Sequence, residues 1–185
     1  MITIIINSTD LNIREKLTDL LVNGPLQTRV IGVVGDTESL LHQLEETLPR
    51  IVIQYVGSGG EPDLEPLKKI RNPYLGLPVL AVGAQFSDEQ VVEIIKAGAM
   101  GYIKVQNLKT ELAAAVDMLV SMKENFYNRE VRTRLSEEIR KINLNARRQR
   151  LTQKEHNVMR MIASGFDMKK IAKELDVSVR TVYTY

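Results

Sequence analysis

The chain has 185 residues, 44% of them hydrophobic and 26% charged, which is enough for one medium-sized domain and a smaller one. It contains no cysteine, which excludes disulfide bonds, thiolate nucleophiles and thiolate zinc sites. Residues 1–6 lack the pattern of a signal peptide, and no later run approaches the roughly 20 apolar residues of a membrane span, so we expect a cytoplasmic protein with no membrane partner.

The formal net charge of +2 conceals an asymmetry along the chain. Residues 1–122 contain 10 Lys and Arg against 15 Asp and Glu, a net charge of −5, whereas residues 123–185 contain 15 against 8, a net charge of +7. Such a split often marks an acidic module joined to one that meets a polyanion, because Lys and Arg displace counterions from phosphates. The other interpretation of the basic part is a solvated linker helix.

Five short runs rich in β-branched residues alternate with helical patterns in residues 1–122. Their nearly continuous apolar character is typical of parallel strands that are covered on both faces. The runs are Ile2–Asn7, Thr28–Val34, 50–56, 78–83 and 101–105.

Helix start and stop signals lie between these runs. They are, in chain order, Asp10 as an N-cap with Gly24 beyond the helix end, Thr37 as a helix start, Ser87 and Gln90 at capping-box spacing, Gly98 as a helix end, and Asn107 as a cap. Five β-α units in this order predict a doubly wound sheet, and the flavodoxin-like strand order 2-1-3-4-5 is the best candidate. Ligands of such folds bind at the carboxyl ends of strands 1 and 3, where we expect Asn7, Ser8 and Tyr55.

Residues 123–149 read as a charged linker helix with one apolar stripe. The stripe consists of Val131, Leu135, Ile139 and Ile142, spaced by four, four and three residues. Three uses remain open for it: packing on the preceding domain, pairing with a second copy of the chain, or covering the C-terminal helices.

Residues 150–185 contain three helix starts in close succession. Thr152 and Glu155 form a capping-box pair before a helix that ends at Gly165, Asp167 caps a second helix, and Ser178 caps a third after a turn at Asp176 and Val177. The residues at core spacing are Val158, Met161, Ile162, Ile171, Ala172, Leu175 and Val182. The pattern predicts a helix-turn-helix, whose last helix enters the major groove of DNA.

This segment resembles the LuxR-type helix-turn-helix of NarL/FixJ response regulators over 35 residues without a gap. The matching residues are Leu151, Thr152, Glu155, Ile162, Ala163, Gly165, Ile171, Ala172, Leu175, Ser178, Thr181 and Val182. The resemblance implies binding to double-stranded DNA in the full-length protein, by Lys169, Lys170, Ser178, Arg180, Thr181, Tyr183 and Thr184. Tyr183 and Tyr185 depart from the family, which usually has a basic residue and a histidine there. The family's fourth helix would follow Tyr185, so we expect the motif to be C-terminally incomplete.

Residues 1–122 resemble a CheY-like receiver domain in the order of their elements but not in their chemistry. The two acids that hold Mg²⁺ in the family correspond to Asn7 and Ser8, and the aspartate that accepts the phosphoryl group corresponds to Tyr55. Gly83 replaces the switch hydroxyl. Tyr102 keeps the aromatic switch, and Val105 replaces the phosphate-binding lysine. Lys104 is one residue early and should point to the opposite face of its strand.

These losses together predict a receiver-like domain that works without aspartate phosphorylation. We therefore expect a DNA-binding transcription regulator, an atypical response regulator of the two-component type that is controlled by dimerisation, a partner or a ligand. We expect a homodimer, with a regulatory protein as a possible further partner. No cofactor, metal or catalytic residue is expected, and His42 and His156 lack a second ligand-type residue at helical spacing. The alternative is an adaptor that binds a protein through its receiver-like surface without engaging DNA.

Overall fold

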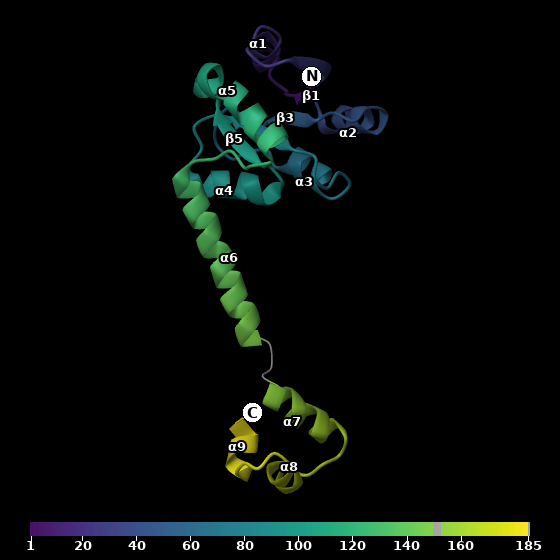
Figure 1. Ribbon diagram of the computed structural model, residues 1–185, viewed down its shortest axis with the longest axis vertical. Coiled ribbons are helices and arrows are strands. Elements are labelled where there is room, and N and C mark those ends of the chain that lie inside the picture. Colours follow the sequence, from purple (N-terminus) through teal and green to yellow (C-terminus); the bar gives the residue numbers. More distant parts are fainter. Residues whose placement is uncertain (150–152, 185) are drawn as a thin grey trace. The chain divides into compact units, whose positions relative to one another are not determined.

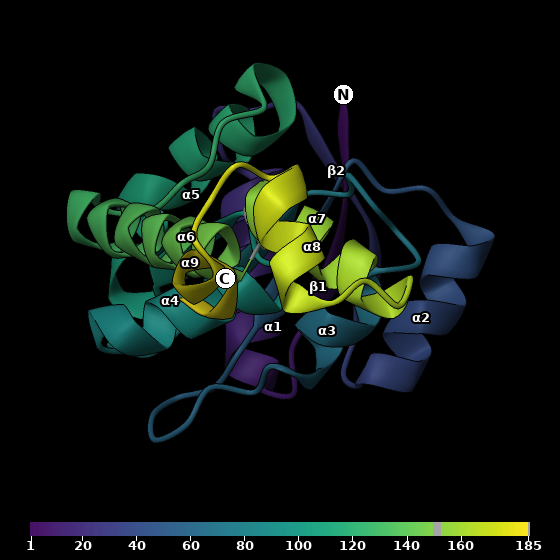
Figure 2. The same cartoon turned by 90° about the horizontal axis from the view of Figure 1, so that it is seen from below.

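The computed structural model describes residues 1–149 and 153–184, and the side chains of residues 1–141 and 155–182. The chain divides into two compact units, Met1–Leu135 and Ser136–Tyr185. The first unit is a parallel α/β domain, and the second contains the end of a long helix and three short helices. The three short helices are labelled α7, α8 and α9 in Figures 1 and 2.

The five strands of the first unit form one parallel sheet in the order β2-β1-β3-β4-β5, which confirms the predicted order. The strands are β1 (Ile2–Asn7), β2 (Thr28–Val34), β3 (Ile51–Tyr55), β4 (Val79–Gly83) and β5 (Gly101–Lys104). The last three are shorter than expected by one or two residues at their ends. Because β1 lies between β2 and β3, Asn7 stands beside Gln54 in the register of the sheet.

Helices cover both faces of this sheet. They are α1 (Leu11–Val22), α2 (Thr37–Glu46), α3 (Glu65–Arg71), α4 (Asp88–Ala97) and α5 (Leu108–Asp117), with a 3-10 turn η1 (Val105–Asn107) and a π-helical turn η2 (Met118–Met122) beside α5. In Figure 1, α1 and α5 lie on one side of the sheet and α3 and α4 on the other. The arrangement follows from right-handed crossovers between parallel strands.

Most of the expected helix caps are present. The Asp10 carboxylate accepts hydrogen bonds from the backbone of Asn12 and Ile13. Ser87 and Gln90 make both bonds of a capping box, and Gly98 ends α4 with a positive φ of 132°. α2 begins at Thr37 as predicted, and its N-cap is Asp36. Asn107 precedes α5 but does not cap it, because its side-chain amide donates to Glu111 instead.

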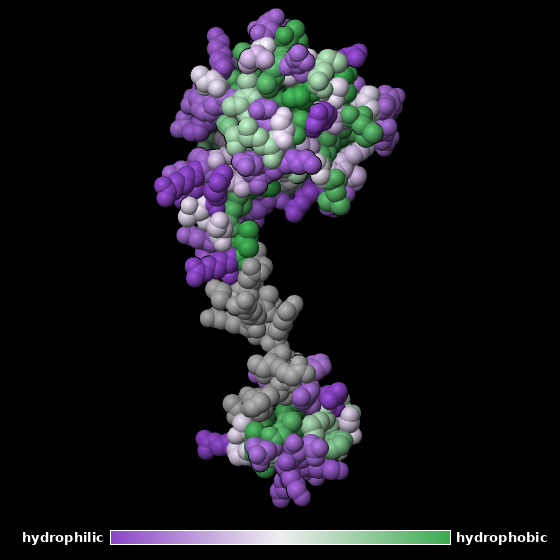
Figure 3. Space-filling view, viewed as in Figure 1, coloured by the Kyte–Doolittle hydropathy of each residue, from purple (hydrophilic) through white to green (hydrophobic). Residues whose placement is uncertain are grey.

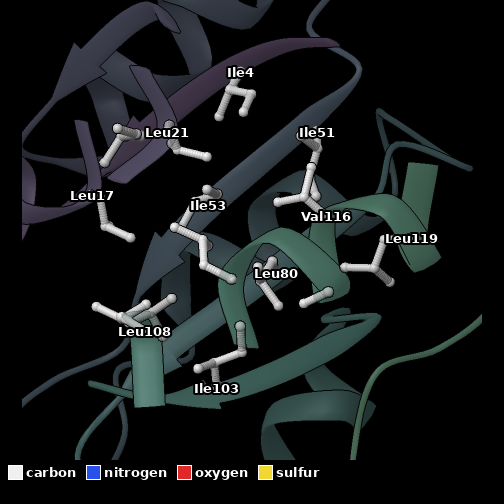
Figure 4. Close-up of a cluster of buried hydrophobic side chains, with 14 of the residues drawn as sticks. Ile4, Leu17, Leu21, Ile51, Ile53, Leu80, Ile103, Leu108, Val116 and Leu119 are labelled. Atoms are coloured by element: carbon white, nitrogen blue, oxygen red, sulfur yellow. The ribbon is translucent and has the colours of Figure 1, made fainter. Parts of the chain in front are cut away.

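Two apolar layers hold the first unit together, one on each face of the sheet. The layer between the sheet and α1 and α5 is shown in Figure 4, where Ile4, Leu17, Ile53 and Val116 converge. These side chains are fully buried. Truncating a buried leucine or isoleucine to alanine costs about 2–5 kcal/mol, so this layer supplies a large share of the domain's stability.

The chain after η2 returns to the edge of the sheet. The backbone nitrogen of Phe126 donates to the Met100 oxygen at 3.0 Å, and the Tyr102 nitrogen donates to the Phe126 oxygen at 2.8 Å. The next helix, α6 (Arg129–Gln149), buries Val131 completely, and Leu135 packs on the same cluster. The α/β unit therefore ends at Leu135, and residues 123–135 of the expected linker pack on it.

The rest of the predicted stripe on α6 behaves differently from its start. Ile139 is 59% exposed, and the side chain of Ile142 lies outside the described residues. Figure 3 shows charged and apolar side chains on different sides of α6 above the grey segment. Among the helices that the structure describes, none is both long and apolar enough to cross a membrane.

The second unit contains α7 (Gln153–Ala163), α8 (Met168–Glu174) and α9 (Val179–Thr184). Its core consists of Val158, Ile171, Ala172 and Val182, packed against Met161, Phe166, Met168, Leu175 and Val177. These residues include most of the predicted core. Ile162 is the exception: it is 41% exposed, because α8 and α9 pack on the other side of α7.

The connections between these helices have the predicted chemistry. Gly165 follows α7 with a φ of +81°, a conformation that favours glycine. Asp167 accepts from the backbone of Lys170 at 2.8 Å, and the Ser178 hydroxyl accepts from the backbone of Thr181 at 3.0 Å. Both caps are therefore confirmed. The predicted cap Thr152 lies outside the described residues.

Candidate functional sites

A chain of amide hydrogen bonds crosses the carboxyl end of the sheet. The side-chain nitrogen of Asn7 donates to the side-chain oxygen of Gln54 at 2.8 Å, and the side-chain nitrogen of Gln54 donates to the backbone oxygen of Tyr55 at 2.7 Å. Asn7 and Gln54 are 2% and 3% exposed. Neutral amides thus occupy the place where the family holds a hydrated cation, and Gln54 is a member of this region that the sequence analysis missed.

Ser8 is used by the turn that follows β1. Its hydroxyl donates to the Asp10 oxygen at 3.0 Å and accepts from the Asp10 nitrogen at 3.1 Å. The Arg14 side chain donates to the Ser8 backbone oxygen at 2.6 Å. Because the Asp10 carboxylate caps α1, it does not replace the missing acids.

These residues do not fit a Mg²⁺ ion. Mg²⁺ requires octahedral oxygen ligation that includes carboxylates, and the two acid positions hold an amide and a hydroxyl. The part of the chain that the structure describes contains no group of three or more His, Cys, Asp or Glu side chains that could hold a metal.

Tyr55 stands at the end of β3 and is 7% exposed. Burial raises the pKa of its phenol, a hydrogen bond with Ser58 opposes this shift, and the charge of Asp10 adds to it. The group is therefore a neutral phenol at neutral pH. It cannot replace the carboxylate that forms an acyl phosphate.

The switch region after β4 is packed with aromatic rings. A Cβ atom built at Gly83 would lie 2.6 Å from the Phe86 ring, so that ring occupies the space of a residue-83 side chain. Phe86 packs on Tyr102 with ring centroids 6.2 Å apart. The Tyr102 hydroxyl donates to the backbone oxygen of Ala84, and burial raises the pKa of Tyr102 to about 12.

Lys104 and Val105 do not join the residues at the ends of β1 and β3. Lys104 lines a different pocket of about 360 Å³, together with Tyr102, Asp88, Phe126 and Arg132. Val105 lies in η1, and its backbone oxygen accepts from the Lys16 ammonium at 3.4 Å. The seven residues expected at one degenerate pocket therefore do not all line the same pocket. Asn7 and Tyr55 line one pocket, and Tyr102 and Lys104 line another. The sequence signal that could have identified Gln54 is a glutamine within an otherwise apolar strand.

A second pocket, of about 520 Å³, opens on the α2 and α3 side of the same sheet end. We call it the α2–α3 pocket. Its lining includes Asn7, Thr9, Gly35, Asp36, Thr37, Glu38, Gln54, Tyr55, Gly57, Asp63, Glu65, Pro66 and Lys69.

The second unit presents basic side chains on α8 and α9. Lys169, Lys170 and Arg180 are exposed, and the ammonium of Lys170 stands 4.6 Å from the centroid of the Phe166 ring. Ser178 is exposed and its hydroxyl lies 2.7 Å from that of Thr181, which is half-buried. The side chains of Tyr183 and Thr184, which were also predicted to contact DNA, lie outside the described residues.

The chain joins a five-stranded doubly wound domain to a unit with three short helices. Residues 149–185 match the family of bacterial regulatory proteins, luxR family. The C-terminal part of the chain therefore carries a LuxR-type helix-turn-helix.

Its sequence is similar to those of several transcriptional regulators. It is 25% identical over 157 residues to the regulatory protein LiaR of Bacillus subtilis, covering 84% of this chain and 74% of LiaR. It is 29% identical over 153 residues to the activator ExaE of Pseudomonas putida, covering 82% and 71%. These relatives are regulators, which agrees with the expectation that the chain is not an enzyme.

Its fold is similar to solved structures of the response regulator RcsB. RcsB of Salmonella typhimurium gives a TM-score of 0.63 at 21% identity, covering 100% of this chain and 88% of RcsB. A structure of two RcsB dimers bound to two parallel DNAs gives 0.61 at 22% identity, covering 99% and 87%. This likeness establishes the fold.

Proposed function

We propose that this protein is a DNA-binding transcription regulator whose receiver-like domain works without aspartate phosphorylation. One observation carries the second half of the proposal: the acceptor position is the buried phenol Tyr55, beside the amides of Asn7 and Gln54. Lys104 lines another pocket. Residues 1–122 would receive the signal, residues 123–149 would link the parts, and residues 150–185 would contact DNA.

The helix-turn-helix supports the DNA-binding half of the proposal. Lys169 is exposed at the start of α8, where a lysine meets phosphates in this class of motif. Lys170 stacks on Phe166, which holds its ammonium near the turn. Arg180 lies on α9, the helix that enters the major groove, so it is the best candidate to read a base edge, with Tyr183 and Thr184 beside it. We also propose a homodimer on DNA, as the solved RcsB complex is described.

DNA binding is tested by fluorescence anisotropy of labelled duplexes across a salt series. Lys169→Ala should weaken binding to all sequences alike and lower the salt slope by about one, because one phosphate contact is lost. Arg180→Ala should cost about 1–3 kcal/mol on the preferred sequence and relax the preference. Lys109→Ala, an exposed lysine of the α/β unit, is the matched control and should change neither value. If the protein showed no salt-dependent affinity for any duplex, an adaptor that binds a regulatory protein would replace this proposal.

Independence from phosphorylation is tested by intact-mass measurement. Acetyl phosphate with Mg²⁺ should leave the mass of the protein unchanged, because the acceptor carboxylate and both metal-binding acids are missing. A stoichiometric acid-labile adduct would overturn this half of the proposal and leave the DNA-binding half standing.

A further inference from the structure

The α2–α3 pocket is built around a buried amide whose orientation is fixed. The backbone oxygen of Tyr55 is an acceptor and nothing else, so the Gln54 amide must direct its nitrogen toward it. The Gln54 oxygen then faces Asn7, and the Asn7 amide must in turn direct its nitrogen toward Gln54. Consequently the Asn7 Oδ1 atom points away from this chain of bonds.

That oxygen is a buried acceptor without a hydrogen-bond partner in the part of the chain that the structure describes. Asn7 is 2% exposed and lines the α2–α3 pocket, and Oδ1 has no hydrogen-bond partner among the described residues. Buried side-chain acceptors in folded proteins are nearly always paired, so an exception calls for an explanation, and a bound donor is one. The oxygen can accept hydrogen bonds but cannot donate one, so it calls for a ligand with an N–H or O–H donor.

The charges around the pocket select among such donors. Four acids line it, Asp36, Glu38, Asp63 and Glu65, against one lysine, Lys69, which pairs with Glu65 at 2.7 Å. The net charge of the lining is therefore −3, and a cation is attracted where an anion is repelled.

The acids of the pocket also disfavour two other kinds of ligand, an anion at the start of α2 and a metal ion. Helix N-termini favour anions through their unbonded N–H groups, but Asp36 already accepts from the Ser39 backbone at 2.8 Å, and this bond lowers the pKa of its carboxyl. The other Asp36 oxygen accepts from the Ser39 hydroxyl at 2.8 Å. Among the described residues, the acids of this pocket do not form a group of three or more that could hold a metal ion.

We propose that the α2–α3 pocket binds a small organic amine whose protonated nitrogen donates to Asn7 Oδ1 while the acidic rim balances its charge. A pocket of about 520 Å³ is of a size usual for small-molecule sites. A regulatory role for this amine rests on the proposed function. The amine would be the signal of a domain that works without phosphorylation.

Putrescine is a suitable probe, with its quaternary analogue, in which every N–H is replaced by a methyl group, as the matched ligand control. In ¹H–¹⁵N spectra of the whole chain, putrescine should shift the side-chain NH₂ signals of Asn7 and Gln54, and the quaternary analogue should not. Asn7→Ala should lower the affinity for putrescine, measured by calorimetry, roughly tenfold or more, since a hydrogen bond to a charged donor is lost. Asn23→Ala, which removes an exposed asparagine bonded to Asp19, should have no effect.

Three results would overturn the inference. They are equal binding of the quaternary analogue, shifts that leave Asn7 and Gln54 unaffected, and tighter binding of Mg²⁺ or phosphate at the same signals. If Asn7→Ala does not fold, Glu38→Gln on the exposed rim should fold and should lower the affinity for putrescine at low salt. All of these measurements report amine binding alone, so their failure is distinguishable from a failure of DNA binding or from phosphorylation of the protein.

Discussion

The ring of Phe86 occupies the space that a side chain at Gly83 would need. A Cβ atom at position 83 would lie 2.6 Å from Phe86 Cε2 and 3.0 Å from a methyl group of Val56. Receivers carry a hydroxyl residue at this position, and here an aromatic ring that bonds to nothing polar takes its place. The loss of the hydroxyl and the packing of Phe86 are thus one structural change.

Gly83→Thr should therefore destabilise the α/β unit. Overpacking of a filled core costs about 1–3 kcal/mol, and we expect a decrease of that size in the free energy of unfolding measured with urea. In a chain that already carries Phe86→Ala, the same Gly83→Thr change should cost less than in the native chain, because the space that the threonine needs is then open. An unchanged free energy of unfolding in Gly83→Thr would contradict the position of the Phe86 ring against Gly83.

The pKa of Tyr102 predicts a change of stability at high pH. The folded pKa of about 12 lies above the ordinary tyrosine value of 10.0, so the phenol stabilises the fold fully below pH 10, and this contribution is lost as the pH rises toward 12. Urea unfolding at pH 9 to 12 should show a steeper fall for the native chain than for Tyr102→Phe. Tyr55, whose pKa is also raised, leaves a smaller fall in the variant. Equal slopes in the two proteins would contradict the assignment.

The start of α6 should behave as part of the α/β unit. Val131 is fully buried, so Val131→Ala should lower the free energy of unfolding by about 1–3 kcal/mol. Ile139→Ala, on the exposed side of the same helix, should change it by less than about 0.5 kcal/mol. The ion pair of Arg134 and Glu89 at 2.8 Å is exposed and should contribute little. Equal effects of the two alanine substitutions would place the boundary of the unit before α6.

A single substitution should not restore phosphorylation. Tyr55→Asp supplies an acceptor carboxylate but no carboxylates at Asn7 and Ser8, so Mg²⁺ would still bind poorly. Intact mass after acetyl phosphate treatment should show no adduct on Tyr55→Asp. The triple variant with Asn7→Asp and Ser8→Asp should be modified more than the single one, and full modification of Tyr55→Asp alone would refute this account.

The cap of α9 should matter for the DNA-binding unit. Ser178→Ala removes the hydroxyl that accepts from the Thr181 backbone, which should cost about 1 kcal/mol of helix stability and lower DNA affinity. Ser164→Ala is the matched control, because that exposed hydroxyl follows α7 and donates to the Arg160 carbonyl without capping a helix start. Circular dichroism and anisotropy on both variants would separate the two effects, and equal losses would argue against a capping role.

The sequence by itself determined the order of the elements and most of their ends. Runs of isoleucine and valine define parallel strands wherever they occur, and local signals such as Asp10, Ser87, Gly98 and Asp167 act through bonds within one turn. The absence of acids at Asn7, Ser8 and Tyr55 was equally visible, because a residue type excludes a chemistry wherever it lies.

The tertiary structure decided what depends on contacts between distant segments. Whether Val131 packs on the α/β unit, on a second copy or on the C-terminal helices could not follow from its spacing alone, since an apolar stripe fits any apolar surface. The position of Phe86 over Gly83 and the bond between Asn7 and Gln54, 47 residues apart, arise from the register of neighbouring strands. Since the register also fixes which amide atoms meet, it leaves the Asn7 oxygen without a partner among the described residues.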